Sequence, residues 1–215
     1  MVDATREHIE QSGVIAVLRG VTADQIDDVA EAVVEGGVRA LEVTADTPGA
    51  IEMIERLATR YRDEEVVVGA GTVLDSETAR STQLAGASFV LCPTFDPDVV
   101  EICNRYGTLV APGVYTPTEA QRAFEAGADL IKLFPAKSGG PDHLAAIKGP
   151  LPQLPIVPTG GVGPDNAGEY IEAGAEAVGA GSSIVSGDAL AAGDFETITE
   201  NARAMVDAVE AARTS

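Results

Sequence analysis

A short apolar run followed by a segment with helical periodicity recurs along the whole chain. The first unit has its apolar run at 14–19 and its helical segment at 23–35, which stops at Gly36 and Gly37. Strands that are apolar at nearly every position and alternate with helices indicate a parallel sheet covered by helices. Eight such units predict one α/β domain over residues 1–215, a TIM (β/α)8 barrel. The other strands are expected at 40–44, 66–72, 89–93, 109–112, 130–136, 156–159 and 177–181, and the other helices at 48–60, 76–84, 97–105, 117–125, 142–147, 165–173 and 195–212.

An open doubly wound sheet is the alternative fold, but no glycine fingerprint follows the first strand. A weak internal repeat favours a barrel built from paired units. It consists of a glycine flanked by small residues before each even-numbered strand, at 36–38, 85–87, 126–128 and 173–175. Glycine stops are also common in any α/β protein, so the repeat alone does not decide between the two folds.

The chain is strongly acidic, with 34 Asp and Glu against 14 Lys and Arg and a net charge of -20. Such a surface argues against a nucleic-acid partner. The acidic residues are spread along the chain, which suggests adaptation of the whole surface to high salt. At molar salt the Debye length is about 3 Å, so repulsion between these charges is largely screened. We therefore hypothesise a halophilic source.

No apolar run is long enough to cross a bilayer, and residues 1–7 lack the basic-then-apolar pattern of a signal peptide. We expect a cytoplasmic protein with no membrane partner. The chain has two cysteines, Cys92 and Cys103, and two distant histidines, His8 and His143, which show no metal-ligand spacing. Both cysteines are expected to be packing residues.

The apolar run at 130–136 contains Lys132, one of three lysines in the protein. Lysine is rarely buried unless it is paired or used, and an apolar environment disfavours its ammonium form. A neutral amine is the nucleophile that Schiff-base chemistry on a carbonyl needs. The alternative is a lysine whose stem crosses the strand edge and whose head reaches water.

Other polar residues also fall at the carboxyl ends of predicted strands, where a barrel places its active site. They are Arg19, Glu42, Thr44 and Thr72. If Glu42 and Lys132 point inward, a carboxylate and an amine meet in one cavity. A buried carboxylic acid with a raised pKa can move the protons that imine formation requires. The alternative for Glu42 is a structural ion pair with Arg19 or Lys132.

Two glycine-rich segments follow the last two predicted strands, at 158–163 and 179–183. Glycines there let backbone amides approach an anion, and these loops are a frequent phosphate site in barrels. A tight turn is the simpler explanation of either segment alone. The substrate-binding candidates in these loops are Thr159, Gly160, Gly161, Gly181 and Ser182.

Four motifs at 41–44, 69–73, 131–136 and 158–162 together resemble those of the 2-keto-3-deoxy-6-phosphogluconate (KDPG) and 4-hydroxy-2-oxoglutarate (KHG) aldolase family. The match runs in order over nearly the whole chain. The resemblance implies that Lys132 forms a Schiff base with the pyruvate portion of the substrate and that Glu42 is the acid and base. It also implies a homotrimer with no metal or organic cofactor.

The resemblance implies further substrate contacts: Arg19 and Thr72 at the substrate carboxylate, and Pro93 and Phe134 in the pocket wall. One position departs from the family pattern. Some members have a carboxylate-binding arginine where this chain has Asp46. Asp46 either points away or leaves that role to Arg19 and backbone amides.

We predict reversible cleavage of a 2-keto-3-deoxy-6-phospho sugar acid to pyruvate and glyceraldehyde 3-phosphate. The sequence does not decide between the gluconate and galactonate epimers. One alternative is a phosphosugar isomerase or synthase with Glu42 as base and no imine, which borohydride would not trap. Another is a non-catalytic sensor of an anionic metabolite, which would release no pyruvate.

Overall fold

The structure is a computed structural model and describes residues 2–214. The bounds of its strands and helices follow in chain order. The strands are β1 (Val14–Leu18), β2 (Ala40–Thr44), β3 (Val67–Gly71), β4 (Phe89–Leu91), β5 (Leu109–Ala111), β6 (Gly113–Val114), β7 (Ile131–Leu133), β8 (Ile156–Pro158) and β9 (Val178–Ala180). The helices are α1 (Val2–Ser12), α2 (Ile26–Glu35), α3 (Ala50–Arg60), α4 (Ser76–Leu84), α5 (Pro97–Tyr106), α6 (Pro117–Glu125), the 3-10 helix η1 (Ala136–Ser138), α7 (Gly140–Lys148), α8 (Pro164–Glu172), α9 (Gly187–Ala192) and α10 (Phe195–Arg213).

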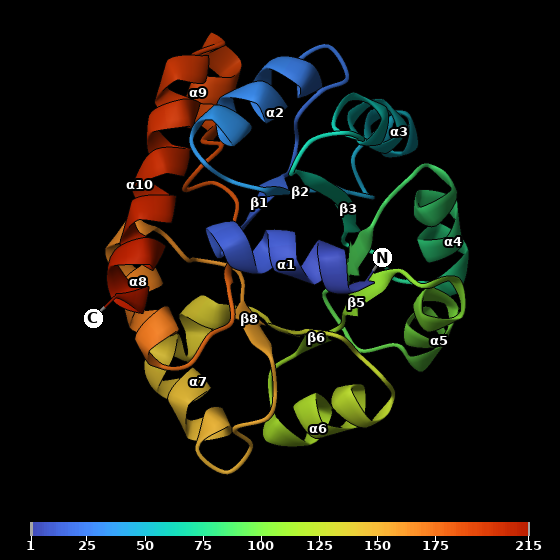
Figure 1. Cartoon of the computed structure of the whole chain (residues 1–215), viewed down its shortest axis with the longest axis vertical. Helices are drawn as coiled ribbons and strands as arrows, with labels where there is room; N and C mark the ends of the chain where they lie inside the picture. The colour runs from blue at the N-terminus through green and yellow to red at the C-terminus, as the bar shows by residue number, and fades with distance from the viewer. Residues whose placement is uncertain (1, 215) are drawn as a thin grey trace.

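The strands form two parallel sheets at the centre of the molecule, with helices arranged around them (Figure 1). Six strands pair in the order β5-β4-β3-β2-β1-β9, and three pair in the order β6-β7-β8. All pairs are parallel, and strand follows helix as the sequence pattern predicts. The predicted α/β class is therefore confirmed.

The structure departs from the expected barrel of eight strands in one respect: the predicted fifth strand, 109–112, ends before Pro112 as β5, and an additional short strand, β6, follows Pro112 in the other sheet. Proline has no N–H to give to a strand ladder. Its carbonyl still accepts a hydrogen bond from the Lys132 amide at 2.9 Å. At the other junction an isolated parallel bridge joins Thr159 to Gly179. Backbone contacts thus link the two sheets on both sides.

Alternating burial along β2 explains how the strands position the site. Leu41 and Val43 pack outward into the core beneath the helices. Ala40 belongs to a second, interior cluster, and Glu42 and Thr44 share its side of the strand. The outward apolar positions therefore fix the register that turns a buried carboxylate inward.

Helix α1 was not predicted from the sequence, because only Val2 and Ile9 are strongly apolar in it. It lies across one end of the strands (Figure 1). Ile9 is fully buried in the interior cluster beside residues that begin strands, among them Phe89 and Leu109. The helix therefore covers the amino ends of the strands and leaves the carboxyl ends open.

No helix within residues 2–214 is long and apolar enough to cross a membrane.

Candidate active site

A cavity of about 630 Å³ opens at the carboxyl ends of β1, β2, β7, β8 and β9. Most of the residues predicted for the site line it, although they come from distant parts of the chain. These residues are Arg19, Glu42, Lys132, Phe134, Thr159, Gly160, Gly161, Gly181 and Ser182.

Lys132 and Glu42 face each other inside this cavity from β7 and β2. Their exposed fractions are only 5% and 1%. The Lys132 Nζ lies 4.0 Å from the Glu42 Oε1 and 5.5 Å from the centre of the Phe134 ring. The lysine head therefore stays in the cavity and does not reach bulk water along the strand edge.

Burial dominates the electrostatics of Glu42. Neither carboxylate oxygen has a hydrogen-bond partner within the described chain, and a separation of 4.0 Å from Nζ is too long for a hydrogen bond. Burial raises the pKa of Glu42, while Lys132 and Arg19 lower it and Asp46 raises it. Attraction to Lys132 at 4.0 Å lowers the pKa of Glu42 by less than burial raises it. Glu42 can therefore hold a proton and act as an acid.

Gly71 makes room for this carboxyl group and was not identified as a site residue from the sequence. A Cβ atom at Gly71 would lie 1.6 Å from the Glu42 Oε1 and 2.3 Å from its Cδ. Gly71 pairs with Thr44 on β2, two residues beyond Glu42. The absence of a side chain there therefore sets where the carboxyl group can sit.

Arg19 is held at the cavity rim by two side chains. Its Nη1 lies 2.8 Å from the Asp46 Oδ2, and its Nη2 donates to the Thr72 hydroxyl at 2.7 Å. Thr72 has φ +56°, a left-handed conformation that is uncommon for threonine. Asp46 thus forms an ion pair with Arg19 at the rim.

The two glycine-rich loops meet beside the cavity. Gly160 and Gly161 both have positive φ, +91° and +85°. The Ser183 hydroxyl donates to the Val162 carbonyl at 2.7 Å and joins the loops. Among the described residues, no acceptor is bound to the amides of Gly161 and Val162. Unbonded amides in a glycine-rich turn are suited to an anion.

Thr159 contributes a buried hydroxyl that has no hydrogen-bond partner within residues 2–214. A Cβ atom at Gly179 would lie 2.3 Å from this hydroxyl, so the neighbouring glycine leaves room for it. Thr159 itself is a residue of the cavity wall.

Two predicted residues, Thr72 and Pro93, do not line the cavity, and of these Thr72 reaches it only through its hydrogen bond with Arg19. Pro93 lies outside the site. It is half-buried after β4, and its backbone packs against Gly113. Apolar residues that were not predicted complete the wall, including Val185 and Leu190. Leu190 lies on α9, a helix that the sequence pattern did not indicate, so its place in the wall could not be anticipated.

The KDPG and KHG aldolase family model matches residues 5–201. The chain belongs to this family. The resemblance inferred from the four sequence motifs is thereby confirmed, and the protein is an aldolase, a carbon–carbon lyase.

Several aldolases of known name align with nearly the whole chain. The 2-dehydro-3-deoxy-phosphogluconate aldolase of Treponema pallidum is 39% identical over 197 residues, 90% of this chain and 91% of the relative. The 2-dehydro-3-deoxy-6-phosphogalactonate aldolase of Escherichia coli is 35% identical over 171 residues, 79% and 83% of the two chains. The KDPG aldolase structure from Legionella pneumophila, with pyruvate captured as a covalent carbinolamine, matches with a TM-score of 0.86 at 32% identity. It covers 94% of this chain and 97% of that one.

Two other features of the aldolase bear on its chemistry. Burial raises the pKa of the Cys92 thiol to about 12, so Cys92 is no thiolate nucleophile near neutral pH. Within residues 2–214, no group of three or more His, Cys, Asp or Glu side chains is arranged to hold a metal ion.

Proposed function

We propose that this aldolase reversibly cleaves a 2-keto-3-deoxy-6-phospho sugar acid to pyruvate and glyceraldehyde 3-phosphate through a Schiff base on Lys132. The observation that carries the proposal is the buried Lys132 amine 4.0 Å from the buried, unbonded Glu42 carboxyl. The pyruvate carbinolamine named in the Legionella structure belongs to a relative and supports the same chemistry here.

The geometry supports one sequence of proton transfers. The Lys132 amine attacks the C2 carbonyl, and Glu42 as acid protonates the carbinolamine hydroxyl, which leaves as water. Glu42, now a carboxylate, takes the proton of the C4 hydroxyl as the C3–C4 bond breaks. Glyceraldehyde 3-phosphate departs, and the cationic imine accepts the electron pair to give an enamine. Glu42 then returns its proton to C3, and hydrolysis of the imine releases pyruvate.

The proposal assigns the two ends of the substrate to opposite parts of the cavity. Arg19 and Thr72 are at the rim where the substrate carboxylate would lie, and Arg19 keeps part of its donor capacity because Asp46 and Thr72 occupy one nitrogen each. The loops at 160–163 and 181–183 would hold the phosphate. Asp46 reduces the local positive charge, so this chain should bind the carboxylate less strongly than one with an additional arginine there.

The gluconate epimer is the proposed main substrate, and the galactonate epimer is a second candidate. Relatives with both names align over most of this chain, at 39% and 35% identity. The two acids differ at one hydroxyl, so the preference between them depends on the pocket contacts that this hydroxyl makes.

We also propose that the two sheets act as one closed (β/α)8 barrel in a single domain over residues 1–215. The contacts that support closure are the hydrogen bond between Lys132 and Pro112 and the bridge between Thr159 and Gly179. Phosphorylated sugar acids are made and consumed inside cells, so the proposal implies a cytoplasmic enzyme.

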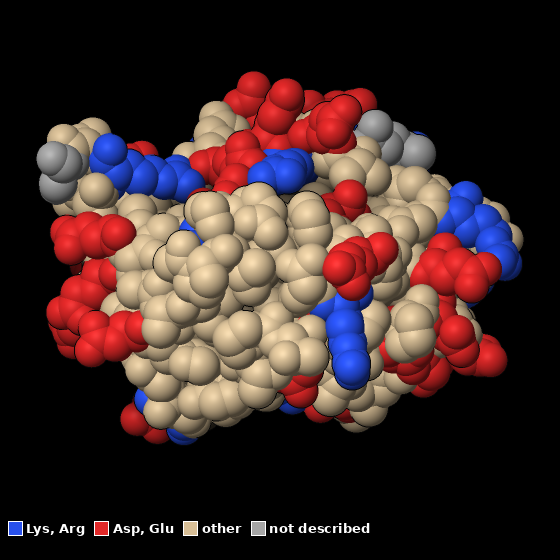
Figure 2. Space-filling model, turned by 90° about the horizontal axis from the view of Figure 1, so that it is seen from below, with Lys and Arg blue, Asp and Glu red and all other residues tan. Residues whose placement is uncertain are grey.

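A homotrimer remains our proposal for the assembly, and one face of the molecule supports self-association. Figure 2 views the molecule from the side where Figure 1 draws α6 and α7, and shows a broad face with few charges bordered by acidic residues. Residues 149–164 contain no charged side chain, and Pro150, Pro152 and Gln153 are exposed there. Copies of a chain with net charge -20 repel each other least where uncharged faces meet. Light scattering of the purified protein at molar salt measures the assembly directly.

A coupled assay tests the proposed substrate. The purified enzyme is given each phosphorylated epimer, and lactate dehydrogenase reports pyruvate. We expect release from the gluconate epimer, abolished by Lys132→Ala. An enzyme that binds either acid without releasing pyruvate would support the sensor alternative, and phosphosugar rearrangement without pyruvate would support the isomerase alternative.

A further inference from the structure

Lys137 lies next to the loop at 160–163, which follows a different strand from its own. It belongs to η1, immediately after the strand that carries Lys132. Its backbone amide donates to the Gly160 carbonyl at 2.9 Å, and the preceding Ala136 amide donates to the Thr159 carbonyl at 2.9 Å. These two bonds fix the Lys137 backbone against the loop that lines the cavity.

The Lys137 side chain runs along Gly161. A Cβ atom at Gly161 would lie 2.5 Å from the Lys137 Cβ, 3.2 Å from its Cγ and 3.0 Å from its Cδ. The stem therefore occupies the space that any larger residue at position 161 would need. Since Gly161 has no side chain, the cation-bearing end of Lys137 can reach an anion bound at the Gly161 amide.

The charge on Lys137 is not used elsewhere in the described chain. Within residues 2–214 the Lys137 ammonium has no ion pair and no hydrogen bond. The other two lysines do have partners, since Lys132 faces Glu42 and Lys148 donates to the carbonyls of Pro152 and Leu154.

We propose that Lys137 is a further substrate-binding residue, whose ammonium binds the phosphate held at the 160–163 and 181–183 loops. The inference rests on the proposed function, because it names a recognition residue for the phosphorylated end of that substrate. A lysine serves as a mobile point charge, whereas the loop amides supply fixed donors. Lys137 should therefore discriminate phosphorylated from unphosphorylated substrates and have no part in imine formation.

Three variants test the proposal. Lys137→Met keeps the stem and removes the charge, and Lys137→Arg keeps the charge. Arg62→Met, in an exposed turn outside the cavity wall, changes the net charge equally. Each is assayed at about 0.1 M salt, where surface charge is incompletely screened, with the phosphorylated acid and with 4-hydroxy-2-oxoglutarate, which has no phosphate.

We expect Lys137→Met to lower kcat/KM for the phosphorylated acid about tenfold to a hundredfold, mainly through KM, as loss of a charge-assisted hydrogen bond predicts. Its kcat/KM for 4-hydroxy-2-oxoglutarate should stay within about twofold of wild type. Lys137→Arg and Arg62→Met should both resemble wild type. Equal losses on both substrates, or no loss on either, would overturn the proposal.

Inorganic phosphate gives a measurement that does not depend on turnover. Calorimetric titration of phosphate into Lys137→Met should show an affinity at least tenfold weaker than in wild type, with Arg62→Met unchanged. An unchanged phosphate affinity would overturn the role of Lys137. Failure of the proposed aldol reaction itself would appear separately, as absence of pyruvate release by the wild-type enzyme.

Discussion

At the scale of single residues, the pKa of Glu42 links activity to stability. Burial raises it from an ordinary value of 4.5. Between 4.5 and the raised value the folded state holds a proton that the unfolded chain has lost, so the free energy of unfolding falls as pH rises through that window. Glu42→Gln has no such proton to lose.

We therefore predict that Glu42→Gln becomes more stable relative to wild type as pH rises above about 4.5, although kcat falls about 10²- to 10⁴-fold. Urea unfolding at several pH values, together with the pyruvate assay, measures both effects. A constant stability difference across this range would mean that Glu42 is ionised in the folded protein throughout.

Gly71 offers a second test at this scale. Gly71→Ala would place a methyl group where the Glu42 carboxyl now lies. Because the displaced atoms are the end of a side chain, we expect the protein to fold and kcat to fall about 10²-fold or more. Gly168→Ala on α8 is the matched control, since its Cβ would meet Ala212 at an ordinary 3.5 Å. Full activity in Gly71→Ala would show that the position of the carboxyl group is not critical.

The sequence identifies the reactive residues of the site, but it does not reveal the contacts that position them. Lys132 and Glu42 stand out because charged residues inside apolar strands are costly. The space that Gly71 provides, and the pairing of Arg19 with Asp46, depend on which strands become neighbours and how far side chains extend. A one-dimensional pattern holds no such information.

At the scale of secondary structure, α1 has a measurable role. Ile9 is fully buried in the interior cluster at the amino ends of the strands. We predict that Ile9→Ala lowers the free energy of unfolding by about 2–5 kcal/mol in urea titrations. Leu84→Ala, at a side chain that is 72% exposed, should be nearly neutral. Since α1 lies at the end opposite the cavity, a changed KM in Ile9→Ala would contradict this view of the helix.

Elements with a strong apolar pattern were predicted, and those that rely on tertiary contacts were not. The strands and the larger helices have continuous or periodic apolar residues that identify them. Helix α1 buries a single large apolar side chain, Ile9, so it shows no apolar periodicity. Helix α9 has only six residues, which is too short for a periodic pattern to be seen. The break at Pro112 follows from proline's missing donor, yet the same run also fits one uninterrupted strand.

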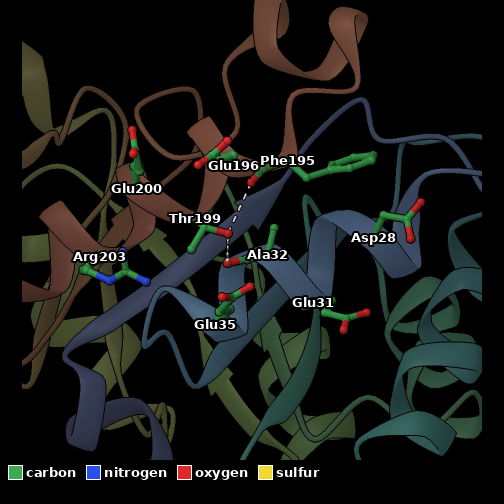
Figure 3. A pocket seen from close by; sticks show the side chains of 9 residues that line it. All are labelled: Asp28, Glu31, Ala32, Glu35, Phe195, Glu196, Thr199, Glu200 and Arg203. Carbon is green, nitrogen blue, oxygen red and sulfur yellow. Dashed lines mark hydrogen bonds between the residues drawn. The ribbon is translucent and has the colours of Figure 1, made fainter.

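At the scale of the whole molecule, the excess of acidic residues should make stability depend on salt. Figure 3 shows a cleft between α2 and α10 that is lined by carboxylates, with Arg203 at one end. A hydrogen bond from the Thr199 hydroxyl to the Ala32 carbonyl, at 3.1 Å, joins the two helices beneath them. Repulsion across the cleft acts at low salt and is screened at molar salt. The acidic residues of the cleft are Asp28, Glu31, Glu35, Glu196 and Glu200.

We predict that Tm rises between about 0.1 M and 3 M potassium chloride. Glu196→Gln with Glu200→Gln should raise Tm at low salt and reduce the salt dependence. The double variant Glu169→Gln, Glu172→Gln on α8 changes the net charge by the same amount outside the cleft. It therefore distinguishes the effect of the cleft carboxylates from the effect of total charge. Equal thermal stability of the wild-type protein at both salt concentrations would refute the halophilic hypothesis.

The central claim is that Lys132 forms an imine with pyruvate. Sodium borohydride added with pyruvate reduces such an imine to a stable secondary amine, which peptide mass spectrometry locates. We predict one adduct, on the peptide that contains Lys132, and none in Lys132→Ala. No adduct in the wild-type enzyme, or an adduct on Lys137 or Lys148 instead, would contradict the mechanism.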